Sequence, residues 1–329
     1  MEYRRLGQCG IKVSSLSYGA WVSFGNQLGV DHAKGIMAAA RDAGVNFWDN
    51  AEVYAKGQAE ELMGQAFKEL GWKRSDHVVS TKLFWGGDGP NDVGLSRKHI
   101  VEGMRASLKR LQMDYVDVVF CHRPDPNTPL EETVRAMSWL VDNGYAFYWG
   151  TSEWPAPMIA QAVAIARELG CVPPQVEQPE YNLFHREKVE KEFLPLYSTP
   201  SGLGLTTWSP LASGVLTGKY SGGSVPPGSR LAVELYKGLA QKKLVEKRDE
   251  LEKADALKPI AQELGCSLAQ LALAWCVSNP HVSTVITGAT RVEQVKENMA
   301  ALAVVPKMSE AVKARIDDIV LRDNSPADA

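Results

Sequence analysis

The segment His77-Val78-Val79-Ser80-Thr81-Lys82 is a short run rich in β-branched residues that ends in an ammonium group. Such runs are typical of buried strands. Two further apolar runs also end at an ionisable side chain, one at Asp49 just before Tyr54 and one at His122. Because the carboxyl ends of parallel strands meet at one mouth of a barrel, the pattern predicts that a carboxylate, a phenol, an ammonium and an imidazole gather there.

Short apolar runs alternate with amphipathic helical segments along most of the chain. The expected strands are residues 16–20, 45–48, 77–81, 115–121, 146–151, 175–178, 203–208 and 284–287. Helical spacing fills the intervals, as in Ile36, Ala39, Ala40 and Ala43, and Ser96 is a candidate N-cap for the helix that carries Ile100 and Met104. Eight strand–helix units with nearly continuous apolar strands predict a closed (β/α)8 barrel, the TIM barrel fold.

Two segments depart from this alternation. The runs at residues 3–6 and 12–14 flank Gly7-Gln8-Cys9-Gly10, which predicts an N-terminal β-hairpin that closes part of the fold. A long insert at residues 213–259 follows the seventh strand, with a Gly- and Pro-rich loop and then a charged helix around residues 241–253. We expect residues 1–329 to form a single barrel domain.

The composition argues against several classes of function. A formal net charge of −3 gives no bulk attraction to nucleic acid or anionic lipid. Five cysteines without a Cys-x-x-Cys pair suit a reducing, cytoplasmic setting, and the six histidines contain no His-x-His or His-x-x-x-His metal pair. The N-terminus lacks an apolar signal core, and no run approaches the roughly 20 apolar residues of a membrane span. We therefore expect no metal, no nucleic acid and no direct membrane insertion.

The residues at the strand ends predict a proton relay. A free tyrosine, with a pKa of about 10, is a poor acid–base catalyst at neutral pH. An ammonium from Lys82 would lower the pKa of the Tyr54 phenol, and Asp49 would hold that ammonium in place. His122 would then orient a substrate carbonyl. Taken singly, each could be structural, as a salt-bridge residue, a half-buried aromatic or a loop cap. Their combination at three successive strand ends favours function.

At these motifs the chain resembles the aldo-keto reductase family. The resemblance rests on Asp49-x-Ala51-x-x-Tyr54 and Ser80-Thr81-Lys82, on Cys121-His122-Arg123-Pro124-Asp125 and Gly150-Thr151-Ser152, and on Trp208-Ser209-Pro210-Leu211 and Gly288-Ala289-Thr290. It implies a (β/α)8 barrel that reduces aldehydes or ketones by hydride transfer from NADPH. Tyr54 would be the proton donor, and Asp49, Lys82 and His122 would complete the catalytic tetrad.

Within that family the chain is most similar to the potassium-channel β-subunit branch, in its plant-type form. This similarity rests on Gly19-Ala20-Trp21-Val22-Ser23-Phe24-Gly25, on Trp85-Gly86-Gly87 and on the run from Phe147 to Trp154. It implies a cytoplasmic homotetramer that is an auxiliary β subunit of a voltage-gated potassium channel, peripheral at a membrane through the channel α subunit. His122 stands where animal members carry Asn, so the tetrad is complete and turnover is expected. The alternative is a nucleotide-sensing channel regulator with slow or vestigial catalysis.

The cofactor prediction rests partly on a motif that is missing. No Gly-x-Gly-x-x-Gly follows a strand, so a Rossmann-type site is not indicated, whereas the helix after Gly288-Ala289-Thr290 offers backbone donors for phosphate. The resemblance implies NADP(H) held by Trp21, Gln27, Ser152, Gln178, Trp208, Ser209, Leu211, Ala212, Lys219, Arg230, Gly288, Thr290, Gln294, Glu297 and Asn298.

Within that set, Ser152 and Gln178 would hold the nicotinamide amide and Trp208 would stack on its ring. Lys219 and Arg230 would face the pyrophosphate, although each could equally be an ordinary charged residue on the solvated surface. Many relatives bind the 2′-phosphate with a Lys-Ser pair and a downstream Arg, which this chain lacks in that form. Arg291 could take over this role. Trp21 and Trp85, flanked by glycines, would wall an apolar substrate pocket.

Overall fold

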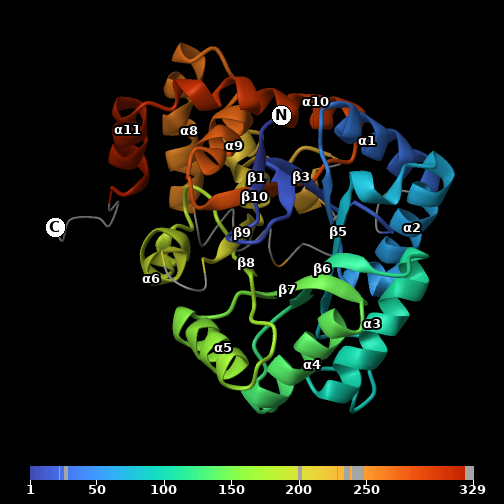
Figure 1. Ribbon diagram of the computed structural model, residues 1–329. Coiled ribbons are helices and arrows are strands. Elements are labelled where there is room, and N and C mark those ends of the chain that lie inside the picture. The colour runs from blue at the N-terminus through green and yellow to red at the C-terminus, as the bar shows by residue number, and fades with distance from the viewer. Residues whose placement is uncertain are drawn as a thin grey trace. The chain divides into compact units, whose positions relative to one another are not determined.

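The computed structural model describes residues 1–21, 23–25, 29–198, 202–227, 229–232, 238 and 248–322. Within these residues, eight parallel strands close into a barrel in the order β3-β4-β5-β6-β7-β8-β9-β10, with β10 pairing back onto β3 (Figure 1). The strands are β3 Leu16–Gly19, β4 Phe47–Asp49, β5 Val78–Leu83, β6 Val116–Cys121, β7 Ala146–Ser152, β8 Val176–Gln178, β9 Gly204–Thr207 and β10 Val282–Thr287. The predicted TIM barrel is confirmed.

Most barrel strands are buried on both faces, as their composition predicted, whereas β7 exposes Phe147. Every residue of β5 and of β6 is buried, and their parallel register pairs Ser80 with Val118 and Lys82 with Phe120. β5 continues to Leu83, one residue beyond the strand end that Lys82 was expected to form. Because side chains alternate along a strand, Ser80 and Lys82 lie on the same face. This alternation directs both polar side chains to one side of the barrel wall.

Helices follow most of the strands, as the alternation required. They are α1 Val30–Asp42, α2 Gln58–Leu70, α3 Arg97–Leu111, α4 Leu130–Asp142, α5 Ala156–Glu168, α6 Leu194–Tyr197, α8 Arg248–Glu263, α9 Leu268–Val277, α10 Val292–Ala300 and α11 Glu310–Val320. The predicted cap at Ser96 is confirmed, since its Oγ accepts a hydrogen bond from His99 N at 3.2 Å. The helix expected after Thr290 is α10, and it ends at Ala300, where residues 301–303 tighten into a 3₁₀ turn.

The N-terminal hairpin consists of β1 Tyr3–Arg5 and β2 Lys12–Ser14, paired antiparallel. Its buried side chains, Leu6, Cys9 and Val13, join a cluster with barrel residues such as Phe47 and Phe120. The hairpin therefore packs its apolar side onto the barrel interior, as expected of a closing element.

The described chain divides into two compact units. The first comprises residues 1–180, 187–208 and 280–296 and holds all the barrel strands, and the second comprises residues 181–186, 209–279 and 297–329. The single domain over residues 1–329 stays a prediction. Residues 241–247 of the predicted charged helix lie outside the described residues. Residues 248–253 are helical, and α8 continues through Pro259, where the insert was expected to end.

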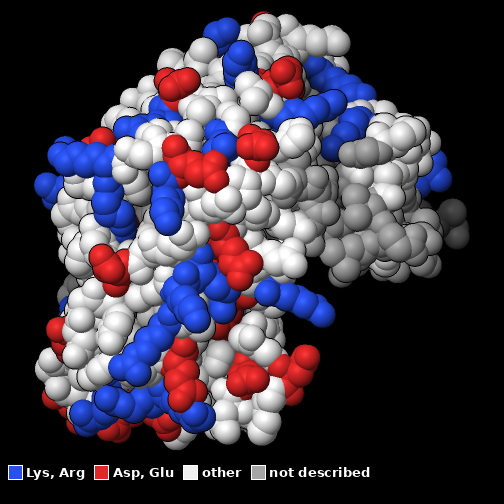
Figure 2. Space-filling view, turned by 90° about the vertical axis from the view of Figure 1, so that its right-hand side faces the viewer, with Lys and Arg blue, Asp and Glu red and all other residues white. Residues whose placement is uncertain are grey.

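On the face shown in Figure 2, basic and acidic side chains are interspersed rather than gathered by sign, and ion pairs such as Lys34 with Glu69 link neighbouring helices. Among the described residues, no single helix is both long enough and apolar enough to cross a membrane. The bent pair of α8 and α9 passes that test only when the two are taken together, and by length and composition alone.

Candidate active site

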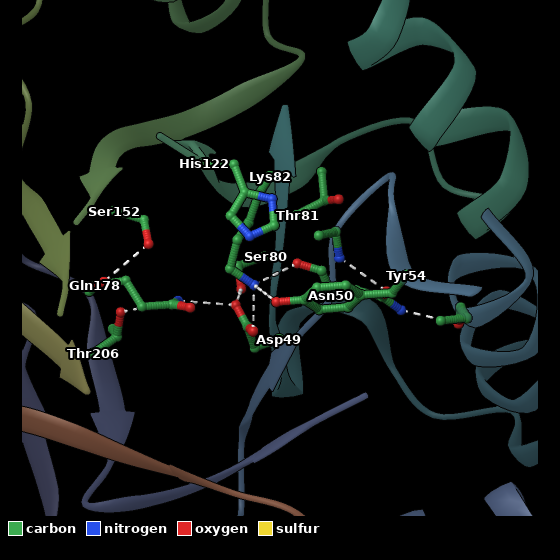
Figure 3. Close-up of polar contacts among 12 residues, drawn as sticks. Asp49, Asn50, Tyr54, Ser80, Thr81, Lys82, His122, Ser152, Gln178 and Thr206 are labelled. Carbon is green, nitrogen blue, oxygen red and sulfur yellow. Dashed lines mark hydrogen bonds and ion pairs between the residues drawn. The ribbon is translucent and has the colours of Figure 1, made fainter. Parts of the chain in front are cut away.

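The four predicted catalytic residues lie at the carboxyl ends of neighbouring strands (Figure 3). Asp49 ends β4, Tyr54 begins the 3₁₀ turn that follows it, Lys82 is the penultimate residue of β5, and His122 comes directly after β6. Asp49, Lys82 and His122 are buried, with 3%, 1% and 6% of their surface exposed. Barrel closure thus brings together side chains from three separate parts of the sequence.

The Lys82 ammonium organises the group. Its Nζ donates to Asp49 Oδ2 at 2.5 Å, to the Asn50 carbonyl oxygen at 2.8 Å and to the Tyr54 hydroxyl at 3.0 Å. An ammonium has three N–H donors, so each of them has an acceptor and the side chain is fixed. Because the Tyr54 oxygen accepts from Lys82, the phenol's own hydrogen is left to point at another acceptor.

The Asp49 carboxylate is held at both oxygens. While Oδ2 binds Lys82, Oδ1 accepts from Ser80 Oγ at 2.8 Å and from Gln178 Nε2 at 3.1 Å. Gln178 Nε2 also lies 3.3 Å from Thr206 Oγ1. Ser80 was not singled out in the sequence as a site residue, although its position two residues before Lys82 places it on the same strand face. The strand period was the signal that could have found it.

Burial sets the protonation states of the phenol and the ammonium. Burial raises the pKa of Tyr54 above its ordinary value, and the opposing charge of Lys82 only partly offsets this effect. The sequence prediction of a lowered pKa was therefore right about the direction of the lysine's effect and wrong about the net result. For Lys82, burial acts to lower the pKa, but the charge and hydrogen bond of Asp49 together with those of Tyr54 outweigh it, and the pKa is raised. At neutral pH the site holds a protonated phenol beside a charged ammonium.

His122 is a neutral imidazole. Burial lowers its pKa well below the usual value, and the charges of Lys82 and Arg123 add to the effect. Its ring lies 5.8 Å from the Tyr54 ring and nearly perpendicular to it. Nδ1 is buried and has no hydrogen-bond partner among the described residues. In the tautomer that carries its hydrogen on Nδ1, this ring can donate to an incoming carbonyl oxygen.

Trp21 and Trp85, the two tryptophans predicted to wall a substrate pocket, lie near the catalytic candidates. The Trp85 ring lies 5.0 Å from the His122 ring, and the Trp21 ring lies 6.4 Å from the Tyr54 ring. Trp21 is 38% exposed, so its indole reaches solvent while contacting the edge of the site. These indoles offer apolar contact near the Tyr54 and His122 side chains.

Some of the predicted cofactor residues lie in the first unit. Ser152 Oγ donates to the Gln178 carbonyl oxygen at 2.9 Å, and the Trp208 ring lies 5.8 Å from the Trp21 ring. Ahead of α10, the Thr290 amide donates to Gln294 Oε1 at 2.8 Å. Gly288 also belongs to this unit. A side-chain amide, hydroxyls, an indole plane and a helix amino end have hydrogen-bonding and stacking chemistry that fits a nicotinamide dinucleotide.

The other predicted cofactor residues lie in the second unit or outside the described part. Ser209 and Ala212 have positive φ angles of 58° and 48°, in a loop that also contains Leu211. Lys219 Nζ lies 5.2 Å from the Tyr220 ring. The other second-unit residues are Glu297 and Asn298. Gln27 and the side chain of Arg230 lie outside what the structure describes.

The structure thus combines an eight-stranded parallel barrel with a phenol, an ammonium, a carboxylate and a neutral imidazole at its strand ends, and side chains of these types can take part in proton transfer. The model of the Aldo/keto reductase family matches residues 15–320, and the chain belongs to this family. It is 67% identical over 320 residues to a "Probable voltage-gated potassium channel subunit beta" of Oryza sativa subsp. japonica and 64% identical over 320 residues to a protein with the same name from Arabidopsis thaliana. In each case 97% of both chains is covered. The resemblance to this family and to its channel-subunit branch is confirmed.

Proposed function

We propose that this protein reduces aldehydes or ketones with NADP(H), and that Tyr54 donates the proton. The observation that carries the proposal is the fixed position of Lys82 Nζ, 2.5 Å from Asp49 Oδ2 and 3.0 Å from the Tyr54 hydroxyl. This arrangement leaves the phenolic hydrogen free and places a cation beside the oxygen that must become negative. Membership of a reductase family supports the same reading.

The residues of the chain account for the proton side of the reaction. NADPH, when bound, would supply the hydride that the carbonyl carbon accepts. Tyr54 gives its proton to the carbonyl oxygen, and the Lys82 ammonium stabilises the phenolate that remains. An alkoxide is a far stronger base than a phenolate, so the transfer stays favourable even though burial raises the pKa of Tyr54. Neutral His122 directs the carbonyl oxygen toward the phenol.

In this proposal the first-unit residues hold the nicotinamide end. Ser152 and Gln178 bind the carboxamide and Trp208 stacks on the ring, while Thr290, two residues before α10, holds the adenosine end. The donor chemistry of these groups supports the assignment.

Replacing Tyr54 with Phe tests the proposal. Tyr54→Phe removes the proton donor, so aldehyde-dependent NADPH oxidation should fall at least about a hundredfold, the usual contribution of a positioned acid. NADPH affinity, measured by fluorescence titration, should stay within about twofold. Tyr3→Phe is the matched control, because Tyr3 is an exposed residue of the hairpin. Turnover of Tyr54→Phe at the rate of the unmodified protein would remove Tyr54 from the mechanism.

The names of the relatives favour a second function that can coexist with the first. We propose that the protein is also a cytoplasmic homotetrameric β subunit of a voltage-gated potassium channel, held at a membrane through the channel α subunit. The 67% and 64% identity to proteins with that name supports the proposal. Sedimentation at several concentrations should reveal the tetramer, whereas a monomer at every concentration would contradict it. Tight nucleotide binding with negligible turnover on a broad aldehyde panel would favour the sensing role over catalysis.

A further inference from the structure

Glu153 stands out as a strained residue at the mouth of the barrel. It comes directly after Ser152, the last residue of β7, and its φ is +60°. This left-handed region is unfavourable for residues other than glycine, and Glu is not among the polar residues that adopt it most readily. Strain of this kind persists where surrounding contacts enforce it, and it concentrates at functional sites.

The Glu153 carboxylate joins the ends of three neighbouring strands. Oε1 accepts from the backbone N of Glu180, two residues beyond β8, at 2.6 Å, and from Trp208 Nε1, directly after β9, at 3.0 Å. Oε2 accepts from Lys188 Nζ at 2.7 Å, and the same ammonium donates to the Glu153 carbonyl oxygen at 3.0 Å. The positive φ of Glu153 is thus accompanied by four hydrogen bonds, three to its carboxylate and one to its carbonyl oxygen.

These contacts fall on the residues that the proposed function assigns to the nicotinamide end. Ser152 precedes Glu153, Gln178 lies two residues before Glu180, and Trp208 is bound directly through its indole N–H. The Trp208 backbone N also donates to the Pro179 carbonyl oxygen at 3.1 Å. One carboxylate therefore fixes both the spacing of these strand ends and the plane of the Trp208 ring.

We propose that Glu153 is a positioning residue for the nicotinamide cofactor, acting through the Trp208 indole and through the ends of β7, β8 and β9. This inference rests on the proposed function, because it assumes that this face of the barrel receives the nucleotide. Glu153 does not need to touch the cofactor. Its contribution is to hold the indole plane and the Ser152 and Gln178 backbones in one arrangement before the nucleotide arrives, which reduces the entropy lost on binding.

The charge state of Glu153 is consistent with this role. Burial acts to raise the pKa of Glu153, but the Lys188 ammonium and the hydrogen bonds from Glu180 and Trp208 outweigh it and hold the pKa below the ordinary value. The carboxylate is therefore ionised at neutral pH. An ionised carboxylate accepts more strongly from an indole N–H than a neutral group would.

The test compares three substitutions at one position. Glu153→Ala removes the carboxylate and keeps the strain, Glu153→Gly removes both, and Glu153→Gln keeps an acceptor oxygen without the charge. In the Ala and Gly variants we expect the Kd and KM for NADPH to rise at least tenfold while the KM for the aldehyde stays within twofold. Gln should recover part of the affinity. Glu187→Ala is the matched control, since Glu187 forms an exposed pair with Lys191 on the segment that carries Lys188 and should change neither constant.

The outcomes separate this inference from the proposed function. Unchanged NADPH affinity in Glu153→Ala, or full recovery in Glu153→Gly, would overturn the role of the carboxylate. If the unmodified protein fails to bind NADPH, the proposed function is wrong. Hydrogen exchange of the Trp208 indole N–H, with its signal assigned by its loss in Trp208→Phe, then tests whether Glu153 holds the indole. Exchange at least tenfold faster in Glu153→Ala supports its hold on the indole, and an unchanged rate refutes it.

Discussion

Replacing Lys82 with Met tests whether one buried ammonium organises the site. Met is similar in length and apolar, so the change removes the charge and the donors with little change in volume. The Lys82 side chain is 1% exposed and that of Asp49 is 4% exposed. Without Lys82, Asp49 Oδ2 keeps a negative charge in a buried position with no cation beside it. Such a charge is costly to bury.

The expected loss of stability follows from this geometry. Removing one partner of a buried ion pair costs about 3–5 kcal/mol, because the other charge is left uncompensated. Ser80 and Gln178 still donate to Asp49 Oδ1, so we expect the lower end, about 3 kcal/mol. Adding Asp49→Asn removes the stranded charge, and the double variant should regain most of the lost free energy of unfolding.

The assay is urea unfolding at pH 7 of both single variants and the double variant, as a double-mutant cycle. Lys98→Met is the matched control, because Lys98 pairs with Glu102 at an exposed i,i+4 position and should cost less than about 1 kcal/mol. A Lys82→Met loss as small as that of the control, with additive effects in the cycle, would refute the reasoning. Turnover of Lys82→Met should also fall. An unchanged pH–rate profile in this variant would show that Lys82 does not influence the ionisation of Tyr54.

Further predictions concern buried titratable groups and one tight helix contact. Burial raises the pKa of Glu177 from 4.5 to about 8. The stabilising contribution of the protonated Glu177 side chain is therefore complete below pH 4.5 and is lost as the pH rises through about 8. Glu177→Gln should flatten this decline in the free energy of unfolding. Burial lowers the pKa of His77 from 6.5 to about 4, so stability is lost as the pH falls between these values; His77→Phe should remove that part of the loss, and an identical acid limb in the variant would contradict it. A Cβ at Gly64 would lie 2.3 Å from the Leu111 carbonyl oxygen, so Gly64→Ala should cost about 1–3 kcal/mol by thermal unfolding, whereas Gly35→Ala, where a Cβ meets nothing within 4 Å, should not destabilise.

The sequence alone determined the architecture because strand and helix periods are local properties. Residues 77–82 and seven similar runs predicted eight strands, and the structure has them with ends shifted by one or two residues. The runs around Gly7 to Gly10 predicted the hairpin. The charged helix after the seventh strand was placed less well, since α8 runs on through Pro259, where a local reading of proline predicts an end.

Tertiary structure decided how the site residues interact. Gln178 lies 129 residues from Asp49 in the sequence and reaches its Oδ1 only because the barrel closes, and Glu153 meets Glu180 and Trp208 for the same reason. The net pKa shift of Tyr54 depends on how completely the barrel excludes water from the phenol, which residue spacing does not encode. Residue identity and period therefore fixed which groups arrive at the barrel mouth. Burial and the register between distant strands fixed their partners and their protonation, because both depend on atoms brought close only by the closed fold.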